Sequence, residues 1–206
     1  MEAAEREAKR HELAQLRERV GQLEDELRRD QPVHWQASQF YTGYYATAGF
    51  VLGMFGAVTS LLFNVVGSAL IEQHPLRLIQ IYLTFPLGER ALELDGGLAL
   101  TIGCCLYIAT GMLLGVAFHI LLCLSTKDSS ILYRLGIATL LAGAMWFVHF
   151  YMILAWLQPT LLGGNWIIEM IDWWVGLITH LIYGWTMAIV FPLGLYVPYR
   201  RQTEQV

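Results

Sequence analysis

The chain has 206 residues, of which 56% are hydrophobic and only 15% are charged. A soluble domain of ordinary composition carries more charge and interrupts its apolar stretches with it, so these proportions are typical of a membrane protein. The formal net charge of −4 offers no basic surface for nucleic acid. The composition therefore excludes a nucleic-acid-binding protein and predicts that the lipid bilayer is the main partner of the chain.

Residues 1–31 are expected to form a cytoplasmic helix with a coiled-coil pattern. The apolar residues recur at alternating spacings of three and four, as do the a and d positions of a heptad repeat; they are Leu13, Leu16, Val20, Leu23 and Leu27. Glu and Arg fill most of the other positions, and Pro32 is expected to end the helix. The pattern favours pairing with another helix over a solitary amphipathic helix.

Residues 32–45 form an aromatic segment in front of the first apolar run. Trp35, Phe40, Tyr41, Tyr44 and Tyr45 all lie in it. Aromatic rings gather at the level of the lipid headgroups, where their apolar bodies and polar tips are both accommodated. We interpret this segment as an interfacial anchor and not as a binding site.

Residues 46–197 predict an all-α domain of four transmembrane helices, followed by a cytoplasmic tail at 198–206. The expected spans cover about 46–71, 97–124, 131–157 and 173–197, and each exceeds the roughly 20 residues that cross a bilayer. The apolar segment at about 76–86 is too short to cross and is expected to form an interfacial helix. Residues 158–166, which contain Pro159 and two glycines, predict a turn before the fourth span.

The basic residues predict the orientation of these spans. Eleven of the thirteen lie in the N-terminal segment, the connection between the second and third spans, and the tail. The other two connections contain only Arg77 and Arg90. Because Lys and Arg accumulate on the cytoplasmic side, both termini are expected in the cytoplasm. We expect the membrane to be the bacterial inner membrane, since no organelle-targeting signal is evident in the sequence.

Small residues recur every four positions on the first two spans. They are Gly49, Gly53 and Ala57 on the first span, and Gly111 and Gly115 on the second. Such stripes allow helix backbones to approach closely within a membrane. They predict tight packing inside the bundle, with contact to a span of another protein as the alternative.

Two histidines are the candidate cofactor-binding residues. His149 precedes the expected end of the third span by about as much as His180 follows the start of the fourth. Since neighbouring spans are antiparallel, both side chains are expected at a similar depth. Two neutral imidazoles could hold haem b or contact a quinone. The structural alternative, a hydrogen bond to a neighbouring carbonyl or hydroxyl, is the stronger expectation, so no cofactor is the leading prediction.

The fourth span contains the sequence His180-Leu181-Ile182-Tyr183-Gly184. It resembles the His-Leu-x-Tyr-Gly segment in the last helix of uncharacterised four-span membrane proteins of bacteria and archaea. The glycine-rich first span is similar too, so the resemblance covers residues 46–197. It implies a four-helix fold and no activity. The N-terminal helix and the long connection after the first span depart from that pattern.

The sequence contains none of the short motifs of hydrolases, P-loop enzymes, dinucleotide-binding enzymes or zinc proteases. No metal-binding spacing of Cys and His is present either. The leading functional hypothesis is a non-catalytic membrane subunit that forms a homo-oligomer or assembles with other membrane protein subunits. An electron-transfer complex is one such assembly. A protein that binds haem b or quinone at His149 and His180 is the alternative, and a small channel or transporter is the third hypothesis.

Overall fold

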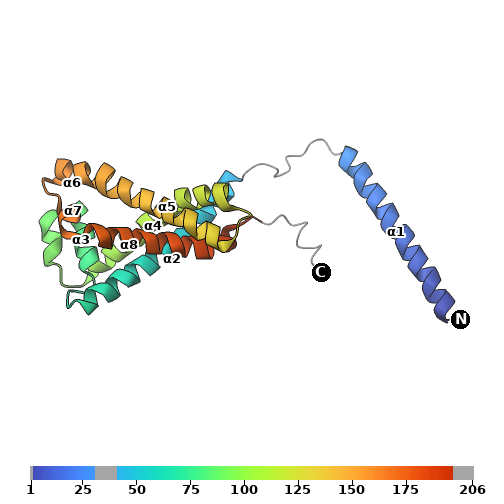
Figure 1. The fold of residues 1–206 in the computed structure, drawn as a ribbon, viewed down its shortest axis with the longest axis horizontal. Coiled ribbons are helices and arrows are strands. Elements are labelled where there is room, and N and C mark those ends of the chain that lie inside the picture. The colour runs from blue at the N-terminus through green and yellow to red at the C-terminus, as the bar shows by residue number, and fades with distance from the viewer. Residues whose placement is uncertain (1, 31–40, 197–206) are drawn as a thin grey trace. The chain divides into compact units, whose positions relative to one another are not determined.

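The structure is a computed structural model that describes residues 2–30 and 41–196. The chain divides into two compact units, Met1–Phe40 and Tyr41–Val206. In the described ranges every regular element is helical (Figure 1). The all-α class predicted from the sequence is therefore confirmed for this part of the chain. We refer to residues 41–196 as the four-helix domain.

The N-terminal unit contains one helix, α1 (Glu2–Asp30). Four of the five heptad residues have described side chains, and all four are exposed: Leu13 by 49%, Leu16 by 58%, Val20 by 54% and Leu23 by 43%. The side chain of Leu27 lies outside the described residues, as do Pro32, Trp35 and Phe40. The apolar seam of α1 is thus an exposed row on a helix that is otherwise polar.

Four long apolar helical runs build the second unit, and each is long and apolar enough to cross a membrane. They are α2 (Thr42–Leu70), α4 (Leu98–Thr126), the run Ile131–Leu162, and α8 (Trp173–Val190) with the short helix η3 (Phe191–Gly194). The third run consists of α5 (Ile131–Phe147), η2 (Val148–Leu154) and α6 (Ala155–Leu162). All four runs overlap the predicted spans, and the first begins at Thr42 instead of residue 46.

Three short helices close one end of the four-helix domain (Figure 1): α3 (Arg77–Leu87), η1 (Gly88–Glu93) and α7 (Trp166–Met170). α3 occupies the segment for which the sequence predicts a short helix. The turn expected from Gln158 is wrong in position, because α6 continues through Pro159 to Leu162. Pro159 is the fifth residue of α6, so the donor that it lacks and the carbonyl that its ring crowds, that of Ala155, concern only the first turn of this helix.

The closest helix contact joins α2 and α4 through their small residues. A Cβ atom on Gly53 would lie 2.5 Å from the carbonyl oxygen of Gly111, and one on Gly49 would lie 2.5 Å from that of Gly115. A Cβ on Gly111 would meet the side chain of Ala57. The two stripes of small residues therefore face each other within this chain, and backbone packs directly on backbone.

Aromatic residues join the beginning and the end of the described chain in the four-helix domain. The ring of Tyr41 stacks on that of Tyr196 with centroids 5.8 Å apart, and Tyr44 meets the same ring edge-on at 5.3 Å. The described chain therefore begins and ends at the same end of the bundle (Figure 1). Tyr45 departs from the predicted anchor, because it lies in the first turn of α2 and is only 2% exposed. Its ring belongs to the core.

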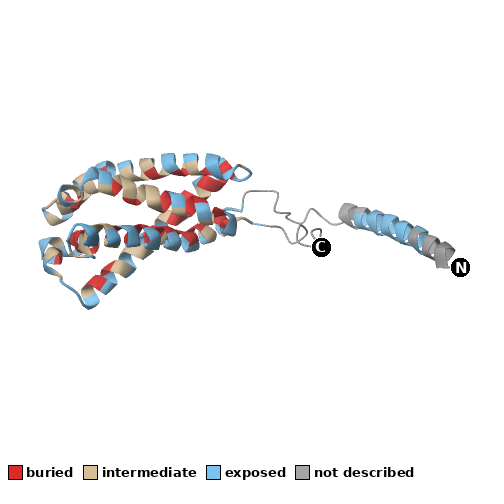
Figure 2. Cartoon of the chain, turned by 60° about the horizontal axis from the view of Figure 1, so that its bottom comes forward, coloured by how far each residue is buried: buried red, intermediate tan, exposed pale blue. Residues whose placement is uncertain are grey.

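The outside of the four-helix domain is apolar. Each long run exposes large aliphatic side chains. Exposed residues, pale blue in the cartoon of Figure 2, recur along all of these helices. Examples with exposed fractions of 57% to 70% are Val66, Leu113, Leu140 and Ile189. A water-soluble domain rarely exposes so much contiguous apolar surface. This surface has the chemistry of a lipid-facing exterior.

Candidate functional site

The candidate site begins at an irregular segment of the third run. Between α5 and α6 the chain forms a π-helix, η2, in which the backbone N–H of Ala155 donates to the carbonyl of Phe150, five residues earlier. π-helical turns are rare and occur frequently at functional sites. His149 lies in the first turn of η2. The wider turn changes how residues before and after it are placed around the helix axis.

The two candidate histidines form a hydrogen bond with each other. Nδ1 of His149 lies 3.2 Å from Nε2 of His180, and the ring centroids are 5.4 Å apart. Nδ1 of His180 lies 2.8 Å from the carbonyl oxygen of Gly176, one turn earlier in α8. The structure thus brings together η2 and α8 through a chain of two imidazoles that ends on a backbone carbonyl.

A glycine allows this approach. A Cβ on Gly176 would lie 2.5 Å from Cζ of Phe150, so only glycine leaves room for that ring against α8. Phe150 in turn packs edge-on against His180, with centroids 6.1 Å apart. Because His149 directly precedes Phe150, the contact between Phe150 and Gly176 fixes the distance between the two histidines.

The histidine pair lines a cavity of about 480 Å³ between the helices. This volume is within the range of about 300–1,000 Å³ that is usual for small-molecule sites. The lining is mostly aliphatic and aromatic and comes from all four long runs and from α3. Residues at its side include Leu106 and Thr110 of α4 and Ile153 of η2, which are also exposed. The cavity therefore opens sideways, between α4 and η2.

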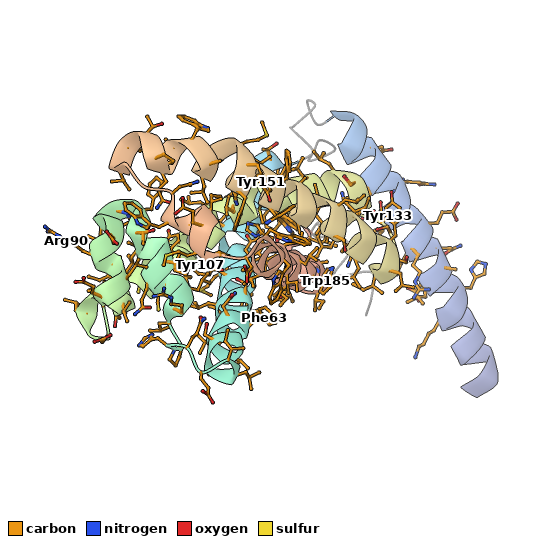
Figure 3. All side chains as sticks on the ribbon, turned by 60° about the vertical axis from the view of Figure 1, so that its left-hand side comes forward. Phe63, Arg90, Tyr107, Tyr133, Tyr151 and Trp185 are labelled. Atoms are coloured by element: carbon orange, nitrogen blue, oxygen red, sulfur yellow. The ribbon has the colours of Figure 1, made fainter. Side chains whose placement is uncertain are left out.

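Hydroxyl groups supply most of the remaining polar atoms of the lining. Tyr107 on α4, labelled in Figure 3, lies 3.0 Å from the hydroxyl of Ser60 on α2. Tyr82 on α3 lies 2.7 Å from the hydroxyl of Thr110. Tyr183 on α8 donates to the carbonyl oxygen of Gly111 at 2.7 Å. These bonds tie the helices together around the cavity, so its walls are cross-linked by polar contacts.

Sequence reasoning singled out only two of these residues. It selected His149 and His180 by depth, and the structure places them in contact. It missed Tyr82, Tyr107 and Gly176, because an aromatic residue or a glycine in an apolar run carries no signal of its own.

The haem hypothesis stays a prediction. Two imidazole nitrogens on opposite sides of one metal ion would lie about 4 Å apart, since each such bond is about 2 Å long. The facing nitrogens of His149 and His180 are 3.2 Å apart, at hydrogen-bond distance. A metal between them would require the rings to separate, whereas a molecule in the cavity beside them would not.

His119 lies apart from this site. It is fully buried on α4, and its Nε2 lies 3.4 Å from the carbonyl of Gly194 and 3.5 Å from the sulfur of Cys123. Its ring packs between Tyr45 and Phe191 at the opposite end of the bundle from α3. These contacts give His119 a structural role in holding η3 against α4.

Comparisons with protein-family models, with curated proteins and with solved structures find no match to this chain.

Proposed function

We propose that the four-helix domain binds an apolar molecule of the membrane in the cavity beside His149 and His180. The observation that carries this proposal is a cavity of about 480 Å³ that is apolar, open at its side, and lined by paired imidazoles. Binding sites of small molecules combine such apolar walls with a few polar groups that orient the ligand. A quinone is one molecule of this kind, in line with the sequence hypothesis.

The membrane setting is part of the proposal. It is supported by the apolar exterior and by four runs of sufficient length. Tyr41 and Tyr196, where the described part of the domain begins and ends, lie together at one end of the bundle. In the sequence, eleven of the thirteen basic residues lie before Tyr41, after Tyr196, or at positions 127 and 134 between the second and third runs. By the positive-inside rule this end faces the cytoplasm. The cavity, which reaches α3 and α7, then lies in the outer half of a bacterial inner membrane.

Filling the cavity tests this function. Leu114 of α4 and Leu157 of α6 both line the cavity, so the double variant Leu114→Trp with Leu157→Trp narrows it from two sides. The matched control changes Leu113→Trp and Leu161→Trp on the same helices, where the side chains are 65% and 62% exposed and do not line the cavity.

The measurement is the amount of apolar molecules extracted from protein purified in mild detergent and identified by mass spectrometry. Wild type and control are expected to retain about one molecule per chain, and the cavity-filling variant is expected to lose most of it. Equal retention in the two double variants would overturn the proposal, because the molecule would then be bound on the lipid-facing surface.

A second candidate function is supported by α1. We propose that the chain is a non-catalytic subunit that self-assembles through the exposed heptad seam; the sequence hypothesis had assembly with other membrane protein subunits as its alternative. With Leu13 at position a, Glu12 and Arg19 occupy g positions, and Arg17 and Glu24 occupy the following e positions. In a parallel dimer Glu12 then faces Arg17 of the second copy, and Arg19 faces Glu24, so the charges are complementary.

Lysines in the seam test the assembly. The variant Leu16→Lys, Val20→Lys and Leu23→Lys should run as a smaller species than wild type on native gels, since charges at a and d positions oppose pairing. The matched control places three lysines outside the seam, at Ala14, Gln15 and Gln22. Assembly that survives in the seam variant would show that α1 does not pair.

A further inference from the structure

We infer that the cavity selects an apolar molecule with a hydrogen-bond donor, such as a phenol, quinol or other hydroxyl, and that Nε2 of His149 accepts the hydrogen bond from this donor. The inference rests on the proposed ligand-binding function and adds the chemical class of the ligand. It follows from the hydrogen bonds that the polar side chains of the lining already donate to partners within the protein.

The histidine chain fixes which nitrogen is free. The carbonyl of Gly176 can only accept, so Nδ1 of His180 carries the proton of that 2.8 Å bond. In a neutral ring Nε2 of His180 is then an acceptor, and Nδ1 of His149 must donate across the 3.2 Å contact. Nε2 of His149 is left without a proton. Neutral rings are the appropriate form, because no carboxylate is among the described residues that line the cavity.

The hydroxyl protons on α2, α3 and α4 are also used. Thr110 donates to the carbonyl of Leu106 at 2.9 Å, so Tyr82 donates to the oxygen of Thr110 at 2.7 Å. Ser60 donates to the carbonyl of Ala57 at 3.0 Å, which leaves Tyr107 as the donor to Ser60. Each of these hydroxyl oxygens keeps accepting capacity, and none has a second proton to offer.

The two hydroxyls on α8 follow the same pattern. Tyr183 donates to the carbonyl of Gly111 at 2.7 Å, and Thr179 donates to the carbonyl of Val175 at 2.8 Å while it accepts from Asn64. With the histidine pair, these complete the polar side chains among the described residues of the lining. The cavity therefore presents acceptors, and the protons of its side chains are committed to internal partners.

This distribution discriminates between ligands. A quinone, ketone or ester carries only acceptors, and in this cavity its oxygen would lose its water without gaining a hydrogen bond. A hydroxyl group can donate to Nε2 of His149. The sequence hypothesis named a quinone as the ligand. Because the lining offers acceptors and no free side-chain donor, we infer that the ligand is instead the reduced quinol or a similar hydroxyl-bearing molecule.

A matched pair of probes tests the inference. 4-Hexylphenol and 4-hexylanisole have the same ring and tail, but only the phenol can donate. Binding to the wild-type protein in nanodiscs is measured for both by titration, with the cavity-filling variant Leu114→Trp/Leu157→Trp as the blank for partitioning into lipid. The phenol is expected to bind roughly three- to tenfold more tightly, the usual worth of one hydrogen bond.

The acceptor is tested by removing both imidazoles. A single His149→Phe change would expose Nε2 of His180 as a substitute acceptor, so the variant is His149→Phe with His180→Phe. It should bind the two probes equally while keeping its affinity for the anisole. Tyr151→Phe is the control, because Tyr151 lies on η2 (labelled in Figure 3), is 46% exposed as a residue, and does not line the cavity. This control should preserve the preference for the phenol.

A second measurement does not depend on a variant that folds. Nitrogen NMR of wild-type protein with labelled histidine should show Nε2 of His149 without a proton, and its resonance should move with 4-hexylphenol but not with 4-hexylanisole. A protonated Nε2, or equal movement with both probes, would overturn the inferred role of His149.

The outcomes separate the two proposals. Equal saturable binding of both probes to wild type, absent in the cavity-filling variant, would overturn the donor preference and leave the ligand-binding function intact. Binding that is the same in wild type and the filled variant would overturn the ligand-binding function itself. Mass spectrometry of the extracted molecule then identifies the source: a quinol or an aliphatic alcohol such as diacylglycerol supports the inference, and a quinone or a molecule with acceptors alone contradicts it.

Discussion

The contact between α2 and α4 predicts a large effect for the smallest possible substitution, Gly53→Ala. The added Cβ would lie 2.5 Å from the carbonyl oxygen of Gly111 and 3.0 Å from the Cα of Gly115. A carbon and an oxygen in contact are normally about 3.3–3.6 Å apart. Both neighbours are backbone atoms of a helix, so neither can rotate away. The two helices must therefore separate locally by about 1 Å, in proportion to that shortfall.

The sign of the effect is decided by two opposing contributions. Overpacking of a closely packed interface costs about 1–3 kcal/mol. Alanine is more favourable than glycine inside a helix by about 1 kcal/mol. Because the atoms that the added Cβ meets are backbone atoms, we take the overpacking cost in the upper part of its range, about 2–3 kcal/mol. We therefore expect Gly53→Ala to lower the free energy of unfolding by about 1–2 kcal/mol, the difference between these contributions. Gly143→Ala in α5 is the control, because nothing lies within 4 Å of its added Cβ and only the gain remains.

The assay is reversible unfolding of the purified protein in mixed micelles, followed by circular dichroism. The Gly53→Ala variant should unfold at a lower denaturant fraction than wild type, and Gly143→Ala at an equal or higher one. A second change, Gly115→Ala, should add less than its own separate cost, because the helices are already apart. If Gly53→Ala proves as stable as wild type, then α2 and α4 do not meet through these residues.

Two further predictions concern the closed end of the bundle and α1. Gln158 is fully buried, donates to Thr84 at 3.0 Å and accepts from the backbone N–H of Ile167 at 3.0 Å. Gln158→Leu should therefore lower the free energy of unfolding by about 1–3 kcal/mol in the same assay, because two buried groups lose their partner. An unchanged stability would contradict these bonds. Glu12→Arg should weaken self-association of α1 by roughly 0.5–1 kcal/mol, as expected for exposed ion pairs. Adding Arg17→Glu should restore association in analytical ultracentrifugation, whereas a further loss would contradict the parallel pairing.

The histidine pair shows how far a sequence carries a candidate site. Counting residues from the ends of the spans placed His149 and His180 at a similar depth, since a helix rises by a constant distance per residue. The same count gives no direction around the helix axis. The direction depends on the π-helix that contains His149 and on the contact of Phe150 with Gly176. Neither feature has a signature in a single sequence.

Tyr45 and Gln158 illustrate the same limit in the fold. Tyr45 follows other aromatic residues at the start of an apolar run, a pattern typical of an interface, yet its ring is buried because α2 turns that face toward the core. Gln158 stands beside a proline, which favours a turn, yet its amide joins α6 to α3 and α7. In both cases the neighbour that decides the outcome is distant in sequence.

The sequence by itself determined the helical class, the number and approximate limits of the long apolar runs, the short helix between the first two of them, and the heptad spacing of the apolar residues in α1. These properties are local, because a helix satisfies its backbone hydrogen bonds within its own segment. The length of an apolar run can likewise be read from that segment alone, without knowing which helices it packs against. Only the tertiary structure decided which faces meet. The cavity, the hydrogen bond between His149 and His180 and the commitment of the lining protons all arise between helices, where packing of specific side chains and not periodicity sets the geometry.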